Sequence, residues 1–177
     1  MDFNIQPTTL HNELLQLIPL QQNDFEDLYA VASDPLIWEQ HPNPLRYQRE
    51  VFKVFFDEAI ASNGAFLIRD TTTNAVVGSS RYYDYDANHH SIKLGYTFIG
   101  RAYWGQNYNR ALKKLMLDYV FQYVNAVHLH IGASNIRSQI ATGRIGAVKI
   151  DEIEVHTPGE LPKLNYIYQI KKEDYNL

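Results

Sequence analysis

The sequence predicts an α/β protein of the α+β type, with a mixed, mostly antiparallel central sheet and helices on both faces. Three strand-like runs follow one another in the middle of the chain and two more close it, so neighbouring strands can pair as hairpins. Helical patterns precede the middle strands and separate the later ones, giving the order β-α-α-β-β-β-α-β-α-β-β. A doubly wound parallel sheet would need repeated βα units early in the chain, and none occurs.

The amino-terminal part contains one short helix. Residues 1–13 carry no clear pattern, and we expect them to be weakly ordered or strand-like. Asn23 or Asp24 can cap a helix that runs to about Ala32, because short polar side chains bond the free amides of a first helical turn. Asp34-Pro35 then stops the helix.

A second helix and three strands follow. Apolar residues at helical spacing predict the helix, and Asn63-Gly64 ends it. The apolar residues are Phe52, Phe55, Phe56, Ala59 and Ile60. Ala65–Arg69 and Val76–Tyr83 flank a polar turn and predict a hairpin. Ser91–Ile99 is the next predicted strand.

The stretch Tyr103–Arg110 is the most informative in the chain. It joins the apolar run Leu94–Ile99 to a helix whose predicted buried face consists of Ala111, Leu112, Leu115, Met116, Tyr119, Val120 and Tyr123. A small polar turn between a strand and a helix leaves backbone N–H groups unpaired at the positive end of the helix dipole, and such a turn can receive phosphate. Arg110 and Lys113, in the first helical turn, can add positive charge toward the anion.

The carboxyl-terminal part repeats the strand-to-helix pattern once and then ends in a hairpin. Val127–Ile131 predicts a strand, and Gly132–Ser138 its exit into a helix. Lys149–His156 and Asn165–Lys171 flank Thr157–Pro162 as two closing strands.

The strand-to-helix turns resemble those of the Gcn5-related N-acetyltransferases (GNAT), in particular the branch that acetylates the N-termini of ribosomal proteins. The family's phosphate-binding pattern, Arg/Gln-x-x-Gly-x-Gly/Ala, aligns with Trp104–Asn109. Asn107 and Asn109 stand where Gly and Gly or Ala are usual. Asparagine is among the residues that best tolerate a positive φ, so the departure is mild.

A second motif of the family follows the later strand. Asn135, Ser138 and Gly146 fit its spacing, and Arg137 completes the Asn-x-Arg-Ser form of this branch. With the opening segment Leu17-Ile-Pro-Leu20, the resemblance extends over roughly residues 14 to 174.

The resemblance implies an acetyl-CoA-dependent N-acetyltransferase whose sheet is splayed between Leu94–Ile99 and Val127–Ile131. It assigns the following residues to acetyl-CoA binding: Tyr96, Thr97, Phe98, Trp104, Gly105, Gln106, Asn107, Tyr108, Asn109, Arg110 and Asn135. With no cysteine in the chain, direct attack of a primary amine on the thioester is the simplest scheme. Ser138 is the candidate acid that protonates the leaving thiolate, since the tyrosine that the family usually uses as this acid falls near Thr142. For the general base, Glu152, Glu154 and a water chain all remain candidates.

An alternative is a non-catalytic CoA-binding or interaction domain with the same fold. Four departures from the family's pattern favour this alternative. They are Asn107, Asn109, Thr142 and Ala111, the last of which stands where the family often has Glu. The sequence also leaves the acetyl acceptor undetermined. The candidates are the N-terminal amine of a peptide, an amino acid, a polyamine and an antibiotic amine. The resemblance is also compatible with a homodimer.

Two further groups of residues have alternative interpretations. His128 and His130 share one face of a predicted strand, but no third ligand has a suitable spacing, and we expect no metal. The run Tyr82–Asp86 either lines a substrate pocket or is simply a strand with alternating aromatic residues. The motifs of a serine hydrolase, a dinucleotide site and an NTP site are absent.

Length and composition exclude several classes. The 177 residues suffice for one domain, 1–177, and no linker or repeat divides them. A net charge of −4 argues against a nucleic-acid partner, and no apolar run approaches the roughly 18 residues of a membrane span. Without cysteines or a signal-like start, we expect a cytoplasmic protein.

Overall fold

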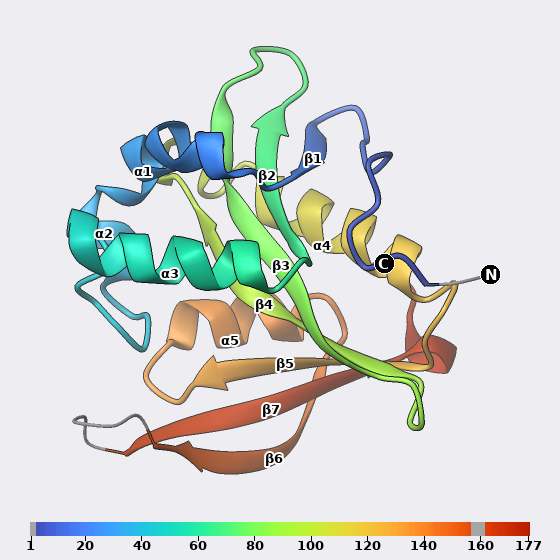
Figure 1. The fold of residues 1–177 in the computed structure, drawn as a ribbon. Helices are drawn as coiled ribbons and strands as arrows, with labels where there is room; N and C mark the ends of the chain where they lie inside the picture. Colours follow the sequence, from blue (N-terminus) through green and yellow to red (C-terminus); the bar gives the residue numbers. More distant parts are fainter. Residues whose placement is uncertain (1–2, 157–161) are drawn as a thin grey trace.

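A seven-stranded sheet forms the centre of the protein in the computed structural model, which describes residues 3–156 and 162–177 (Figure 1). Its strand order is β1-β2-β3-β4-β5-β7-β6, with bounds β1 Leu15–Pro19, β2 Ala65–Asp70, β3 Val76–Asp86, β4 Ser91–Ile99, β5 Ala126–Gly132, β6 Val148–Val155 and β7 Lys163–Lys171. Neighbouring strands are antiparallel except for the parallel pair β4 and β5. The predicted mixed, mostly antiparallel sheet is confirmed. Most of the expected loop at Thr157–Pro162 lies outside the described residues.

Helices cover both faces of the sheet, as expected. They are α1 Phe25–Ala32, α2 Pro35–Trp38, α3 Arg49–Ala61, α4 Tyr108–Val120 and α5 Ile136–Gly143. Helices α1 and α3 lie in front of the sheet in Figure 1, over a core that includes Phe52, Phe56 and Leu67. Helix α4 lies behind it, over a core that includes Leu112 and Val127. No described helix is long and apolar enough to cross a membrane.

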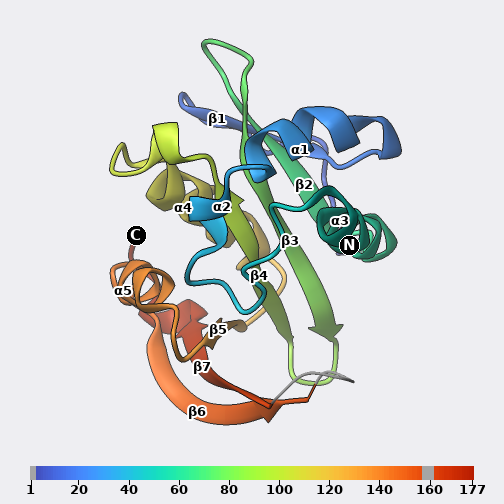
Figure 2. The same cartoon turned by 90° about the vertical axis from the view of Figure 1, so that its left-hand side faces the viewer.

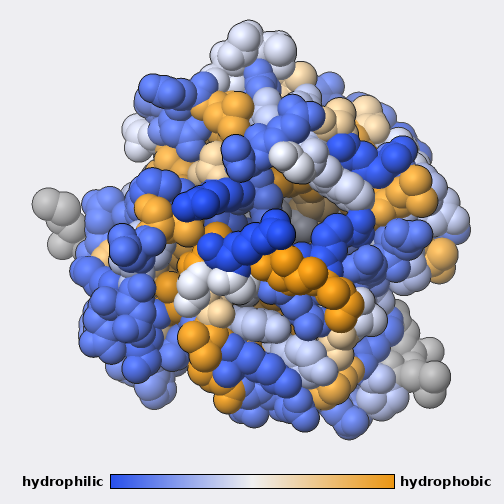
Figure 3. All heavy atoms as spheres, turned by 180° about the vertical axis from the view of Figure 1, so that it is seen from behind, coloured by the Kyte–Doolittle hydropathy of each residue, from blue (hydrophilic) through white to orange (hydrophobic). Residues whose placement is uncertain are grey.

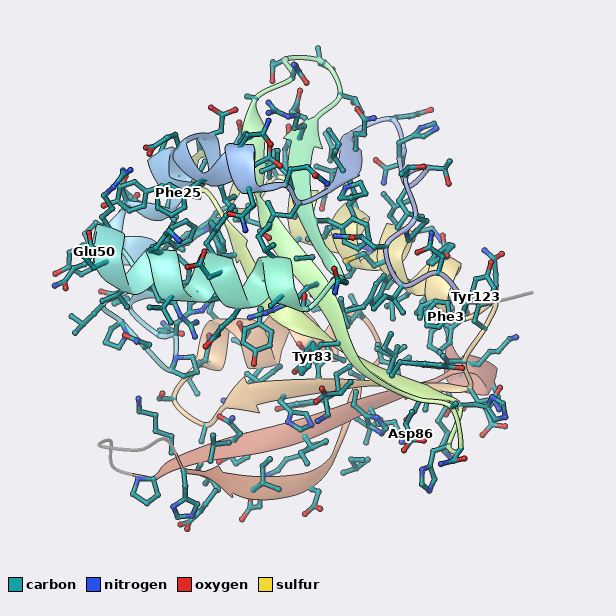
Figure 4. The ribbon with its side chains drawn as sticks, in the orientation of Figure 1. Phe3, Phe25, Glu50, Tyr83, Asp86 and Tyr123 are labelled. Atoms are coloured by element: carbon teal, nitrogen blue, oxygen red, sulfur yellow. The ribbon has the colours of Figure 1, made fainter. Side chains whose placement is uncertain are left out.

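Residues 3–14, the described part of the chain before β1, are held by side-chain packing and not by strand pairing. The one isolated bridge among them joins His11 to Gln16. Phe3 stacks on Tyr123 with 4.9 Å between ring centres, and both are labelled at the right of Figure 4. Leu10 is buried in the core behind the sheet. For residues 3–13 the expectation of a strand-like or weakly ordered start is therefore wrong, because apolar side chains anchor them; residues 1 and 2 lie outside the described residues.

Helix α2 was not predicted, because Asp34-Pro35 was interpreted only as a stop signal. The same pair also starts a helix: the Asp34 carboxylate accepts a hydrogen bond from the Leu36 amide at 3.0 Å, and proline suits the first helical position. The buried Trp38 donates its ring N–H to the Ala32 carbonyl at 2.7 Å. Helix α2 is thereby fixed beside β4, where the Trp38 and Phe98 rings lie 4.9 Å apart.

The sheet opens between its two parallel strands. β4 and β5 pair only at Ser91–Ala126, Ile92–Val127 and Lys93–His128. Beyond Lys93, β4 stays paired with β3 and β5 with β7, so the facing edges of β4 and β5 diverge. Figure 1 shows the resulting wedge opening toward the left, and Figure 2 looks into it. The predicted splay is confirmed, and it leaves backbone N–H and C=O groups free along both edges.

The surface seen from behind is mostly hydrophilic, with hydrophobic side chains in small separate groups (Figure 3). Ile136 and Ile140 of α5 and Val148 and Ile150 of β6 are among the exposed hydrophobic residues. Patches of this size are ordinary for a globular protein, so the wedge is the more informative feature.

Candidate active site

The turn before α4 lies at the rim of the wedge. Gly105 and Asn107 both have left-handed backbones, with φ of 74° and 66°, and Asn107 is the residue that precedes the helix. Asparagine thus holds the conformation for which the family uses glycine. Asn109 lies within the first turn of α4 and needs no special φ. The Trp104 ring N–H anchors the turn to the Ile99 carbonyl at 2.8 Å.

The turn presents a row of unpaired backbone donors. The amides of residues 105–110 donate no hydrogen bond to any other described residue, and no side chain caps α4. Such donors at a helix start are favourable for an anion, because the helix dipole adds to their partial positive charge. The turn therefore has the chemistry of a phosphate site.

Basic residues gather near this turn, although Lys113 is not among them. Arg110 is exposed, and the Arg137 guanidinium lies 4.3 Å over the Trp104 ring. Lys113 instead lies buried under β4, with Nζ 2.7 Å from Thr97 Oγ1. Burial lowers the pKa of Lys113 to about 7. The expectation that Lys113 adds charge toward a phosphate is wrong.

The Tyr108 side chain also points away from the turn. Its hydroxyl donates to the Asp70 carboxylate, and this bond, together with those from Thr73 and Thr72, lowers the pKa of Asp70 to about 2. Only the backbone amide of Tyr108 is available to a ligand.

A bulge in β4 shapes the inner end of the wedge. The register places Ser79 opposite Phe98 and Arg81 opposite Gly95, so both Tyr96 and Thr97 lie opposite the single residue Ser80. Tyr96 has a left-handed φ of 51°. Tyr96 turns its side chain toward α3, whereas Thr97 turns toward Lys113 of α4.

The exit of β5 forms the opposite rim. The buried Asn135 accepts a hydrogen bond from the Ser138 amide at 3.1 Å through Oδ1 and so caps α5. The Ser138 hydroxyl is half-buried and has no partner among the described residues. Gln40, which follows α2, accepts from the Arg137 amide at 3.0 Å and ties this rim to α2. Thr142 is buried at the position where the family's tyrosine falls.

The face of the wedge toward α3 carries polar aromatic and imidazole groups. Val127, Leu129 and Ile131 point into the core behind the sheet, so His128 and His130 point toward the front. Burial and then Lys93 lower the pKa of both histidines, which keeps them neutral at pH 7. Among the described residues, no three metal-ligating side chains come together.

The Tyr82–Asp86 run belongs to β3, and its side chains alternate between the two faces of the sheet. Tyr82 is buried and donates to the Met116 carbonyl, as a core residue. Tyr83 lies on the other face, between α3 and β5 in Figure 4, with its ring edge-to-face to Tyr96 at 5.0 Å. Asp84 forms an ion pair with Lys93 at 2.8 Å, next to a polar hollow at the β3–β4 hairpin. Asp84, Asp86, Lys93 and His128 are among the residues that line this hollow, which lies at the opposite end of β4 from the turn before α4.

The candidate bases Glu152 and Glu154 lie on the edge strand β6, which β7 separates from β5. Glu152 is ion-paired with Lys149 at 3.0 Å, and both glutamates are exposed. They do not face the wedge.

The comparisons with known proteins agree with this architecture. The family model of the acetyltransferase (GNAT) domain matches residues 15–148. The chain belongs to the GNAT acetyltransferase family. The acetyl donor of this family is acetyl-CoA.

Several solved structures share the GNAT fold. A GCN5-related N-acetyltransferase from Brucella melitensis superposes with a TM-score of 0.76 at 18% identity, covering 98% of this chain and 84% of that one. A GNAT acetyltransferase from Bacillus anthracis gives 0.74 at 18% identity, with 93% and 98% covered. A spermidine N-acetyltransferase from Vibrio cholerae, solved with CoA and spermine, gives 0.67 at 18% identity, with 93% and 99% covered. No curated protein sequence matches the chain.

Sequence reasoning on this GNAT acetyltransferase missed Arg81. The residue is only 5% exposed, and its guanidinium carbon lies 3.5 Å over the Tyr96 ring. The available signal was an arginine inside a strand whose neighbours are apolar, small or aromatic.

Proposed function

We propose that the protein transfers an acetyl group directly from acetyl-CoA to a primary amine, as a single catalytic domain. The observation that carries this proposal is the row of unpaired amides at residues 105–110, placed at the rim of an opened parallel strand pair. The amides would hold the pyrophosphate, with Arg110 and Arg137 adding positive charge nearby.

The residues along the wedge would then position the rest of the cofactor. Acetyl-CoA supplies the acetyl group as a thioester. The free edge of β4 at Tyr96–Phe98 would bond the pantetheine amides and polarise the carbonyl, while the Asn135 side-chain amide would donate to pantetheine from the other side. Ser138 would donate a proton to the leaving thiolate. We assign acceptance of the amine proton to His130, a neutral imidazole on the face toward α3.

The Asn135-x-Arg137-Ser138 sequence supports a place in the branch of ribosomal-protein acetyltransferases, and hence a peptide N-terminus or a small amine as acceptor. A non-catalytic CoA-binding domain is the second candidate. The absence of a tyrosine acid at Thr142 favours it.

Replacing Asn107 with Asp tests the cofactor site. The new carboxylate would face the phosphates, and we expect calorimetry to show acetyl-CoA binding weakened by at least about tenfold, from the magnitude of charge-assisted contacts. Aspartate tolerates a positive φ and is a favourable residue at a helix start, so the melting temperature of the free protein should hold or rise.

Asn107→Gly is the matched control, because it keeps the left-handed turn without adding charge. We expect its affinity to stay within about threefold of the original protein. Equal acetyl-CoA affinity in the Asp variant and the Gly variant would show that the turn does not hold the pyrophosphate.

A further inference from the structure

Arg81 is a buried cation to which the described part of the chain gives no anionic partner. Its Nε atom is inaccessible and makes no hydrogen bond, and no ion pair to the guanidinium forms among the described residues. Burial lowers the pKa of Arg81, and Tyr96, Glu58 and Tyr83 act in the opposite direction. A guanidinium nevertheless stays protonated in proteins and carries five N–H donors.

Aromatic rings hold this guanidinium in place without satisfying its donors. Its central carbon lies 3.5 Å over the Tyr96 ring and 5.5 Å from the centre of the Phe55 ring. Stacking on the rings restricts the plane of the group, and its two terminal NH2 groups, which form no hydrogen bond among the described residues, are left for a planar acceptor. A buried polar group without a partner is costly, and in native proteins it commonly marks a ligand or water site.

The position of Arg81 places it beside the amine and not beside the pyrophosphate. It lies opposite Gly95, next to the Tyr96 bulge, whereas the phosphate turn begins beyond Ile99 at the other end of β4. A cofactor held at the turn by its pyrophosphate, as proposed above, would extend along β4 toward the bulge with its acetyl end. The amine would then approach on the side where Tyr83, Tyr96 and His130 lie.

Arg81 gives this side of the wedge a buried positive charge that favours an anion. The exposed Glu58 on α3 acts on Arg81 electrostatically but forms no ion pair with its guanidinium. The nearest hairpin carboxylates are already paired, Asp84 with Lys93 at 2.8 Å and Asp86 with His89 at 2.7 Å. The Arg81 guanidinium would repel an ammonium group of a polyamine placed beside it.

We propose that Arg81 binds a carboxylate of the acceptor, so that the preferred substrates are amines that carry a carboxylate close to the reacting nitrogen. A free amino acid and a peptide with an acidic residue after its N-terminus both present this group. The inference rests on the proposed acetyl transfer and specifies its acceptor. A guanidinium–carboxylate pair with two parallel hydrogen bonds supplies both affinity and orientation.

The test compares acceptors that differ only in this group. Thiol release from acetyl-CoA is measured with common amino acids against their α-carboxamides, with peptides beginning Ala-Asp against Ala-Asn, and with spermidine. We expect kcat/KM to favour the carboxylate member at least about tenfold. The pair that shows the preference identifies the acceptor as an amino acid or a peptide.

Arg81→Gln should lower kcat/KM for the carboxylate members roughly 10- to 100-fold and change the carboxamides less than about threefold. Arg49→Gln is the control: Arg49 also stacks on aromatic rings, Phe25 and Tyr29, but it already pairs with Glu26 at the surface. Equal losses for both members of each pair, or a preference for carboxamides or spermidine, would overturn the inference.

A binding measurement separates this inference from the proposed function. Calorimetry with acetyl-CoA should give the same affinity in Arg81→Gln and the original protein; absence of binding in the original protein would refute the proposed function itself. The CoA-saturated protein is then heated with each acceptor. The acceptors that carry a carboxylate should raise the melting temperature of the original protein and should not raise that of Arg81→Gln. If both proteins respond equally, the carboxylate site is refuted, and this conclusion does not depend on whether acetyl transfer occurs.

Discussion

Replacing Ser138 with Ala is expected to reduce acetyl transfer about 100-fold, the order typical of losing a positioned proton donor. The hydroxyl lies half-buried at the exit of β5 and has no partner among the described residues, so it is available to a departing thiolate. Acetyl-CoA affinity should change little, because protonation of the thiolate matters in the transition state. Thiol release and calorimetry measure the two quantities.

Ser134→Ala is the matched control, because Ser134 is exposed on the same loop and only its backbone carbonyl is bonded. This variant should leave both the rate of acetyl transfer and the acetyl-CoA affinity unchanged. Unaltered turnover in Ser138→Ala would remove Ser138 from the mechanism.

Asn135→Ala adds a second comparison at this rim. Asn135 can serve both roles, because its carbonyl oxygen is used by the cap of α5 and its side-chain N–H groups are left for a ligand. The variant should therefore lose about 1 kcal/mol of stability and also bind acetyl-CoA more weakly.

Replacing Lys113 with Met is expected to stabilise the protein at pH 7 by an amount of the order of 4 kcal/mol, because each unit between the folded and the ordinary pKa is worth about 1.4 kcal/mol. The folded protein holds the pKa of Lys113 at about 7, below the ordinary lysine value of 10.5. Between these values the unfolded chain binds more protons, so the stability of the original protein should rise as pH increases from about 7 to 10. The full destabilisation is present below pH 7.

Urea unfolding across this pH range provides the measurement. The stability of the Met variant should not rise between pH 7 and 10, since a buried apolar side chain of similar length replaces the titrating group. Lys114→Met is the control, because Lys114 is an exposed neighbour paired with Asp118 at 3.0 Å and should matter by less than about 0.5 kcal/mol. A pH dependence that persists in Lys113→Met would assign it to other groups.

The sequence predicted the elements with strong local signals. The bounds of β4 match the predicted Ser91–Ile99, because turn residues end its β-rich run on both sides. The hairpin of β2 and β3 and the capped start of α5 follow from similar local chemistry. The resemblance pointed to the turn before α4 as the phosphate site that we propose, and the left-handed backbone of Asn107 shows that asparagine adopts the conformation this turn needs.

Features that depend on packing could not be predicted in this way. Apolar spacing placed Leu115 and Tyr119 on the buried face of α4, whereas the structure rotates that face toward Lys113 and Leu117. Nothing local reveals that a lysine will lie under β4 beside Thr97. The role of Arg81 likewise depends on a bulge in one strand and a ring from α3, which only the folded chain brings together.

The most direct test of the account is to follow an isotopically labelled acetyl group from acetyl-CoA by mass spectrometry, with a panel of amino acids, peptides and polyamines as acceptors. Direct transfer predicts labelled amine and free CoA in equal amounts, with no label on the protein. Binding of acetyl-CoA without labelled product from any amine would contradict the account and favour the non-catalytic alternative.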